Sequence, residues 1–278
     1  MATPIAVEDP LDPRLADFFG LTDATLRRRT EAQERIFIAE GITAIRRLLA
    51  SSHPVRAILI TPSKLSQLEI DVSGCSVFVA ELDLLKRVVG FGLHRGAVAS
   101  GDRLSPRSVA EVLSGSERLA ILEGINDFEN LGSIFRSASA LGIDGVLLDP
   151  TCADPYYRRC VRVSMGEVLH VPFARLPSWP EFLGDVKAQG FELIGLSPKA
   201  AQPIGTSTTS RPSAVLLGAE GSGLSSAAAS RCDRMVRIPM RSGPDSLNVG
   251  AAAAIAFHWL RTNDEEIGRS GLAGGSTP

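Results

Sequence analysis

Side chains that could position and activate a reacting group occur in three short segments of this chain. The first is NLGSIFR at residues 130–136, which contains Asn130 and Arg136. Apolar residues recur at helical spacing from residue 131 to residue 141, so Asn130 is predicted to cap a helix with its side-chain oxygen. Arg136 lies on the opposite face. A helix cap and an exposed arginine explain the two residues in isolation. Their predicted position after a strand of an α/β sheet favours a ligand site instead.

The second segment is LGAEGSGLS at residues 217–225, directly after an apolar run. Its glycines allow the backbone to approach a ligand closely or to adopt a positive φ. Their order does not match the dinucleotide-binding fingerprint, and the lysine of a phosphate loop is missing. Glu220 would also repel a phosphate group. The segment therefore indicates a ligand-binding turn of another kind, or a turn alone.

The third segment is IPMRSGPDSLNVG at residues 238–250, which continues into four alanines. Ser246 is predicted as the N-cap of the following helix, with Asn248 in its first turn. An Ala-rich helix can pack very closely against another backbone, as a purely structural buried helix also does. The four histidines (His53, His94, His170 and His258) have no metal-binding spacing. No G-x-S-x-G nucleophile elbow is present.

These segments must be positioned by a domain that begins near residue 118. From there, apolar runs alternate with helical patterns, which predicts an α/β domain with a mostly parallel sheet covered by helices on both faces. We place this domain at residues 118–265, a polar linker at residues 105–117, and a disordered, Gly-rich tail at residues 266–278. The predicted strands are residues 119–122, 145–148, 169–171, 193–196, 214–217 and 236–238. The predicted helices are residues 131–141, 157–168, 179–189 and 247–261.

Residues 1–104 form a separate, smaller α/β unit in this prediction. A helical pattern opens at FIAEG, residues 37–41, and continues through Ile45 and Leu48. Two short runs rich in β-formers, residues 55–61 and 77–80, are predicted strands.

Composition and charge limit the classes of function. The chain has 278 residues, of which 44% are hydrophobic, as in soluble globular proteins. No apolar run approaches the ~20 residues that cross a bilayer, and the N-terminus lacks the pattern of a secretory signal. The four cysteines are scattered, which predicts neither a metal site nor a disulfide framework and fits a cytoplasmic protein.

The net charge of −2 argues against indiscriminate nucleic-acid binding. An RNA partner stays possible because arginines cluster locally, although a solvated surface explains each cluster by itself. The clusters are residues 27–29, then Arg158, Arg159 and Arg162, and then Arg231, Arg234, Arg237 and Arg241.

Taken together and in this order, the three segments resemble the motifs of the SpoU/TrmH family of RNA 2′-O-methyltransferases, within the knotted SPOUT class. RVSMG at residues 162–166 matches a further family segment, and the resemblance covers residues 118–262. The N-terminal unit is similar to the RNA-binding domain of many members, through FIAEG and LHRGAV at residues 93–98. One departure is Phe128-Glu129 before Asn130, where the family often has a proline-containing turn.

The resemblance implies a trefoil-knotted sheet, a homodimer, and transfer of a methyl group from S-adenosylmethionine to a ribose 2′-hydroxyl of structured RNA, without a metal. Ribosomal RNA is favoured over transfer RNA because of the N-terminal domain. A neutral or cationic ligand is compatible with Glu220. The implied catalytic residues are Asn130, Arg136, Glu220, Ser246 and Asn248. The implied cofactor-binding residues are Leu196, Gly218, Glu220, Gly221, Ile238, Met240, Ser246 and Leu247.

Two roles are open for Arg136. The family arginine is often described as a general base, but a guanidinium with a pKa above ~12 is hard to deprotonate. We favour a role in which Arg136 grips a phosphate and stabilises the developing oxyanion. A non-catalytic RNA-binding protein and a nucleotide-dependent oxidoreductase are the alternatives. The presence of all five implied catalytic residues disfavours the non-catalytic protein, and the order of the glycines in residues 217–225 disfavours the oxidoreductase. The sequence leaves open the modified nucleotide, any link to drug resistance, and what Arg27–Arg29 contact.

Overall fold

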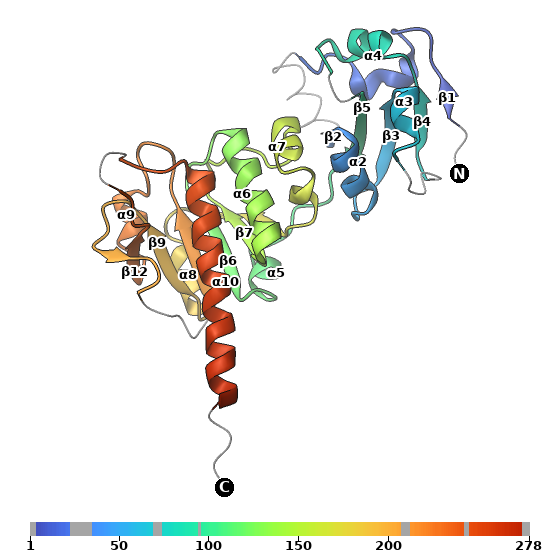
Figure 1. Ribbon diagram of the computed structural model, residues 1–278. Coiled ribbons are helices and arrows are strands. Elements are labelled where there is room, and N and C mark those ends of the chain that lie inside the picture. The colour runs from blue at the N-terminus through green and yellow to red at the C-terminus, as the bar shows by residue number, and fades with distance from the viewer. Residues whose placement is uncertain are drawn as a thin grey trace. The chain divides into compact units, whose positions relative to one another are not determined.

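The computed structural model describes residues 4–22, 35–68, 74–93, 96–206, 212–241 and 245–273, and the side chains of these up to residue 262. The arginines at residues 27–29, His94 and the end of the predicted tail, residues 274–278, lie outside the described residues. The chain forms two compact units (Figure 1). The first comprises Met1–Ser105 and Pro155–His170, and the second comprises Pro106–Asp154 and Val171–Pro278.

The first unit contains a five-stranded mixed sheet in the order β1-β4-β3-β5-β2. β5 runs antiparallel to both β2 and β3, and the other pairs are parallel. Leu15, Phe18, Leu85 and Val89 are buried against one face of the sheet. The strands are β1 (Ile5–Ala6), β2 (Ile36–Glu40), β3 (Val55–Ile60), β4 (Ser76–Val79) and β5 (Ala97–Asp102). The helices among the described part of residues 1–105 are η1 (Pro13–Phe18), α2 (Ile42–Leu49), α3 (Pro62–Leu65) and α4 (Leu82–Val89).

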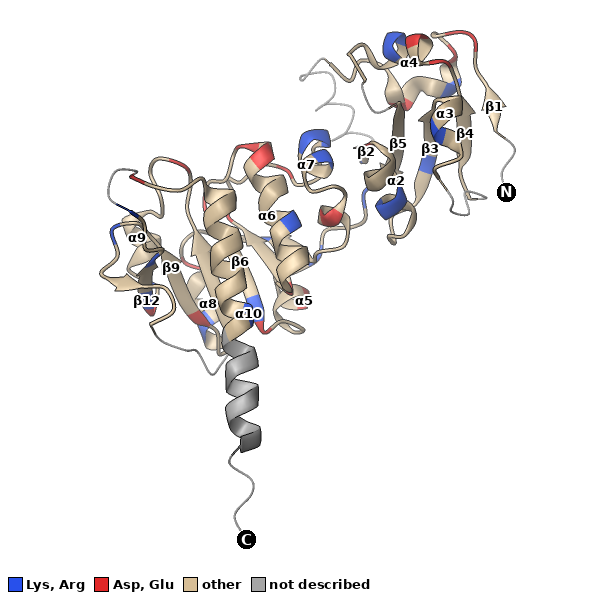
Figure 2. Cartoon of the chain, in the orientation of Figure 1, with Lys and Arg blue, Asp and Glu red and all other residues tan. Residues whose placement is uncertain are grey.

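Residues 155–170 fold with this first unit, although they lie far along the chain. They form α7 (Arg158–Val163) and η2 (Glu167–Leu169), and Figure 2 shows basic residues gathered on α7. Tyr156 stacks on Phe37 with ring centroids 5.4 Å apart. The Arg158 Nη1 atom lies 2.7 Å from a carboxylate oxygen of buried Glu40. The sequence prediction assigns this segment, RVSMG included, to the domain at residues 118–265. Its contacts with Phe37 and Glu40 could not be predicted, because a stacked ring and a buried ion pair between distant residues leave no local sequence pattern.

The second unit contains a seven-stranded sheet in the order β10-β12-β9-β11-β6-β7-β8. Every strand pair in it is parallel, which confirms the predicted α/β class with a mostly parallel sheet. The strands are β6 (Arg118–Leu122), β7 (Gly145–Leu148), β8 (Phe173–Arg175), β9 (Glu192–Leu196), β10 (Gln202–Pro203), β11 (Ser213–Leu217) and β12 (Arg234–Arg237).

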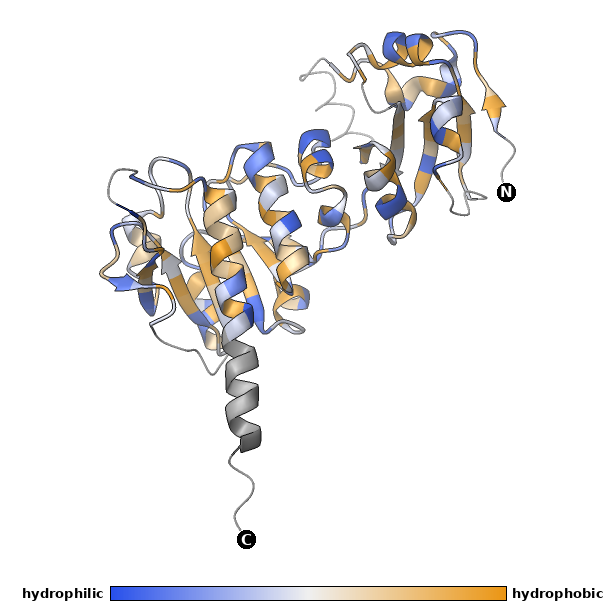
Figure 3. Ribbon diagram, viewed as in Figure 1, coloured by the Kyte–Doolittle hydropathy of each residue, from blue (hydrophilic) through white to orange (hydrophobic). Residues whose placement is uncertain are grey.

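Helices cover both faces of this sheet (Figure 1). α6 (Phe128–Leu141) and α10 (Val249–Ala273) pack side by side on one face. α5 (Val109–Leu113), α8 (Leu183–Ala188) and α9 (Ser226–Ala229) contribute to the apolar cluster on the other. The central strands are hydrophobic almost throughout (Figure 3), as expected for parallel strands that are buried on both sides.

Several predicted elements differ from the structure. The predicted linker contains α5, whose Ser108–Glu111 capping box stabilises a short helix that packs on β7 and β8. The first four residues of FIAEG lie in strand β2 and not in a helix, because they are buried on both faces, and Gly41, with φ 89°, separates them from α2. The strand predicted at residues 169–171 is wrong, because Leu169 ends η2 and the strand of this region, β8, begins only at Phe173, directly after Pro172. α8 begins at Leu183, later than the predicted 179.

The last helix is longer than predicted. α10 continues to Ala273, past the expected domain end at residue 265 and through most of the segment expected to be a disordered tail. Adding a residue to an existing helix costs far less than nucleating one, so an Ala-rich start can extend through a segment with Gly268 and Gly271.

Candidate active site

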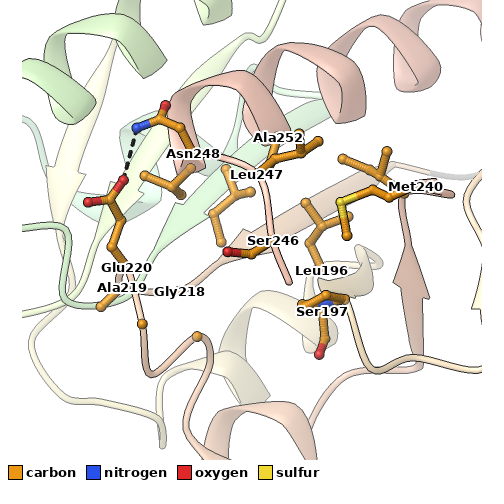
Figure 4. Close-up of a pocket in the computed structure, with 16 residues that line it drawn as sticks. Leu196, Ser197, Gly218, Ala219, Glu220, Met240, Ser246, Leu247, Asn248 and Ala252 are labelled. Atoms are coloured by element: carbon orange, nitrogen blue, oxygen red, sulfur yellow. Dashed lines mark hydrogen bonds between the residues drawn. The ribbon is translucent and has the colours of Figure 1, made fainter. Parts of the chain in front are cut away.

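The strand order of the second unit reverses between β6 and β11. β7 and β8 lie beyond β6 on one side, whereas β9 and β12 lie beyond β11 on the other. In parallel α/β sheets, ligands bind outside the carboxyl ends of the strands at such a reversal. The loops that leave β9, β11 and β12, on the β11 side of this reversal, enclose a cavity of about 280 Å³ together with the start of α10 (Figure 4).

All eight residues predicted to bind the cofactor line this cavity, although their contact with a cofactor stays a prediction. Sequence reasoning missed other lining residues, among them Ser197, Pro198 and Ala252. Ser197 and Pro198 directly follow Leu196, so the end of the predicted strand could have indicated them. The predicted lining residues are Leu196, Gly218, Glu220, Gly221, Ile238, Met240, Ser246 and Leu247.

The glycine loop, residues 218–224, is a closed turn that only glycine allows at key positions. The Gly223 amide donates a hydrogen bond to the Ala219 carbonyl at 2.9 Å. A Cβ atom on Gly218 would lie 2.1 Å from the Gly223 carbonyl carbon and 2.2 Å from the Leu224 nitrogen. Gly221 and Gly223 have φ values of 84° and 69°, which side chains disfavour. The glycines are therefore needed for the shape of the loop itself.

Three predicted catalytic residues meet at the edge of the cavity through Asn248. Its Oδ1 atom accepts hydrogen bonds from the Gly250 and Ala251 amides, at 3.0 and 3.3 Å. Backbone amides can only donate, so Nδ2 must face the other way. Nδ2 donates to Asn130 Oδ1 at 2.8 Å and to Glu220 Oε1 at 2.9 Å (Figure 4 shows the second bond). Asn248 thus fixes an amide and a carboxylate from two other elements.

The helix caps differ from the prediction. The cap of α6 is Asp127, whose Oδ1 atom accepts from the Glu129 and Asn130 amides, so Asn130 lies in the first turn and is 9% exposed. The cap of α10 is Asn248 and not Ser246, which is exposed and lines the cavity two residues earlier. In both places two good capping residues lie within three positions, and the pattern alone does not choose between them.

Arg136 lies apart from the other predicted catalytic residues. It is exposed on α6, six residues after Asn130, which is about 9 Å along a helix axis. Among the described residues it makes no hydrogen bond or ion pair with Asn130, Glu220 or Asn248. Within one chain, the structure therefore brings together Asn130, Glu220 and Asn248, places Ser246 on the same cavity, and leaves Arg136 outside this group.

The contact between α6 and α10 sets the distance between Asn130 and Asn248. A Cβ atom on Gly250 would lie 2.8 Å from Ser133 Oγ and 3.1 Å from Ser133 Cβ. Glycine at this position therefore lets the start of α10 approach α6 closely enough for the two asparagine side chains to bond.

Comparisons with known proteins agree with this geometry. Residues 117–258 match the model of the SpoU rRNA Methylase family. An uncharacterised tRNA/rRNA methyltransferase of Mycobacterium tuberculosis is 43% identical over 267 residues, covering 94% of this chain and 92% of the relative. This chain belongs to the SpoU family of RNA methylases. The family match confirms the resemblance inferred from the three motifs.

Solved structures share the fold of this SpoU family protein. A crystal structure of an RNA 2′-O ribose methyltransferase has a TM-score of 0.78 at 25% identity and covers 95% of this chain and 100% of its own. An AdoMet-bound rRNA methyltransferase from Sinorhizobium meliloti also has a TM-score of 0.78, at 23% identity, and covers 93% and 98%. The similarity to the Sinorhizobium meliloti protein shows a shared fold.

Among the described residues of this SpoU family protein, no group of three or more His, Cys, Asp or Glu residues is arranged to hold a metal ion. No helix in the same part of the chain is both long and apolar enough to cross a membrane.

Proposed function

We propose that this protein transfers a methyl group from S-adenosylmethionine to a ribose 2′-hydroxyl of structured RNA, with ribosomal RNA favoured over transfer RNA. The observation that supports it best is the joining of Asn130, Glu220 and Asn248 by hydrogen bonds at the edge of the cavity. An RNA 2′-O ribose methyltransferase shares the fold over nearly the whole chain.

The chemistry of the cavity suits this cofactor. Leu196, Ile238 and Leu247 offer apolar contacts, and among the described residues that line the cavity Glu220 is the one that carries a charge. A carboxylate is compatible with a sulfonium cation and would repel a phosphate. The volume is close to the lower end of the ~300–1,000 Å³ range of small-molecule pockets, which favours a compact, bent cofactor. When bound, S-adenosylmethionine supplies an electrophilic methyl group.

The polar residues then orient the attacking hydroxyl. Catalysis of this displacement needs the reacting atoms held ~3–3.5 Å apart and the ionising oxygen stabilised. Asn130 and Glu220, fixed by Asn248, offer hydrogen-bonding atoms beside the cavity, and exposed Ser246 can contact the substrate. We assign Arg136 to the RNA phosphate and the developing oxyanion, since a guanidinium does not readily accept a proton.

A homodimer is part of this proposal. Arg136 is exposed and lies apart from the site in its own chain, so it is available to the site of a second copy. Ile255 on α10 is 40% exposed, and Ala251 on the same helix is also exposed. Such a surface can pack against another helix. The trefoil knot and the cytoplasmic location stay predictions.

The test is methyl transfer from radiolabelled S-adenosylmethionine to purified ribosomal and transfer RNA, followed by mapping of the modified nucleotide. We expect label in ribosomal RNA at a ribose 2′-oxygen. Label only in transfer RNA would contradict the favoured target, label on a base would contradict the chemistry, and no label in either would contradict the proposal.

The role of Arg136 is tested in the same assay with Arg136→Lys. Lysine keeps the charge but cannot form the two-pronged contact of a guanidinium with a phosphate. We expect turnover to fall at least about tenfold while the affinity for S-adenosylmethionine is unchanged. Near-normal turnover would contradict this role, and a pH–rate profile that assigns a proton-accepting group to Arg136 would favour a general base.

A further inference from the structure

We infer that Glu123 and Trp179 brace the glycine loop in its cofactor-binding shape, which makes Glu123 a positioning residue for S-adenosylmethionine. The inference rests on the proposed assignment of the cavity to this cofactor. Neither residue lines the cavity, so any effect they have on cofactor binding must act through the loop.

Glu123 directly follows β6, in the middle of the sheet, and is 9% exposed. Its two carboxylate oxygens have different donors. Oε1 accepts from the Trp179 indole Nε1 at 2.5 Å, and Oε2 accepts from the Ser225 backbone amide at 2.8 Å. Hydrogen bonds to an ionised carboxylate are stronger than those between neutral groups. The carboxylate therefore ties the residue after the glycine loop to a rigid central strand.

The position of Ser225 is transmitted to the cavity through close backbone contacts. Ser225 caps α9, since its hydroxyl accepts from the Ala228 amide at 3.1 Å. The two residues before it, Gly223 and Leu224, press directly against Gly218, which lines the cavity. With no space between these two limbs of the loop, a shift at Ser225 must also move Gly218.

The residue types explain why a carboxylate is needed. Trp179 packs against the apolar cluster between the sheet and α8, as does Leu224 of the loop. Its indole and the Ser225 amide are both donors, so the group between them must accept twice. A glutamine can accept through one oxygen only, and its amide nitrogen would face one of the two donors. Glu123→Gln therefore loses one hydrogen bond and places the amide nitrogen of the glutamine against the indole or the Ser225 amide, so that two buried donors face each other.

The experiment measures binding of S-adenosylmethionine to the full chain by titration calorimetry, which requires no knowledge of the RNA target. We expect Glu123→Gln to weaken binding about tenfold, equivalent to about 1.4 kcal/mol. Glu181→Gln is the matched control, because Glu181 is an exposed glutamate close to Trp179 in sequence, and its affinity should equal that of the wild type. Trp179→Phe keeps the bond to Ser225 and should weaken binding about threefold. It also serves as the test if Glu123→Gln does not fold.

A spectroscopic measurement separates positioning from general stability. The chain has two tryptophans, so Trp259→Phe leaves Trp179 as the single reporter. We expect S-adenosylmethionine to change the emission of Trp179, although this residue lies outside the cavity, and Glu123→Gln to abolish that change. A lowered melting temperature with unchanged affinity in both brace variants would overturn the inference.

One more variant distinguishes a wrong inference about Glu123 and Trp179 from a wrong assignment of the cavity to S-adenosylmethionine. Ala252 lines the cavity, so Ala252→Phe should fill it and abolish binding. If Ala252→Phe binds normally, the cavity assignment fails. If Ala252→Phe loses binding while Glu123→Gln and Trp179→Phe bind like the wild type, the cavity assignment stands and the brace is wrong.

Discussion

Replacing Asn248 by aspartate tests whether the amide group of Asn248 organises the catalytic residues. The substitution is isosteric, and aspartate is as good an N-cap as asparagine, so the start of α10 should be kept. The group facing Asn130 and Glu220 changes from a donor to an acceptor, at 2.8 and 2.9 Å. The change therefore removes the bonds between the three residues while leaving the helix cap in place.

The magnitude follows from these contacts. Leaving the buried Asn130 oxygen without its donor costs about 1–3 kcal/mol. Two carboxylates 2.9 Å apart repel by about 1.4 kcal/mol in water and by about 6 kcal/mol at an effective dielectric constant of 20. Glu220 and Asn248 are exposed, so the lower value applies. We expect Asn248→Asp to lower the free energy of unfolding by about 2–4 kcal/mol and to reduce methyl transfer at least about tenfold.

The assay compares the wild type, Asn248→Asp and Asn248→Ala by urea unfolding at low and high salt, together with methyl transfer to RNA. Alanine loses the cap, at a cost of about 1 kcal/mol, but introduces no repulsion. The stability of the aspartate variant should therefore recover in part near 1 M salt, where the Debye length falls to about 3 Å, and that of the alanine variant should not. Wild-type turnover in Asn248→Asp would refute the reasoning.

Three further predictions concern packing and titration. Gly250→Ala should separate α10 from α6 at Ser133, lower the free energy of unfolding by about 1–3 kcal/mol and reduce methyl transfer. The double variant with Ser133→Ala should recover part of both, as measured by thermal unfolding and methyl transfer. Burial lowers the pKa of His53. Below about pH 6.5 the unfolded chain therefore binds more protons than the folded one, so the free energy of unfolding should decrease as the pH is lowered. Urea unfolding across this range should show a smaller decrease in His53→Gln. Burial, with Asp149 nearby, raises the pKa of Cys152 to about 12. At pH 8 iodoacetamide should therefore modify this thiol far more slowly in the folded than in the unfolded protein. Mass spectrometry measures the two rates, and equal rates would contradict the prediction.

The sequence predicts most of the second unit because its strands have a strong local pattern. β7 was predicted with its observed bounds, and β6, β9 and β11 differ by one residue at their first position. Parallel strands buried on both faces are continuous apolar runs bounded by turns, which a pattern can locate. The residues that line the cavity were predicted from the resemblance to the SpoU/TrmH motifs and not from this pattern, which places only the strands that those motifs follow.

What could not be predicted depends on choices between similar local options or on long-range contacts. Asp127 and Asn130 are both good caps for α6, and so are Ser246 and Asn248 for α10. Which residue caps each helix depends on the hydrogen bond between the side chains of Asn130 and Asn248, which are 118 residues apart. Glu123 was missed because one acidic residue after an apolar strand has no pattern of its own. Its partners, Trp179 and Ser225, are known only from the fold.

The placement of residues 155–170 has a consequence for how such proteins can be cut or recombined. The chain leaves the second unit at residue 154, contributes α7 and η2 to the first, and returns at residue 171. A fragment starting at residue 106 would keep this segment but lose Phe37 and Glu40, its partners, and would expose Val161 and Val168, which are buried in the full chain. A recombinant that replaces residues 1–105 must therefore supply new partners for Tyr156 and Arg158 in place of Phe37 and Glu40.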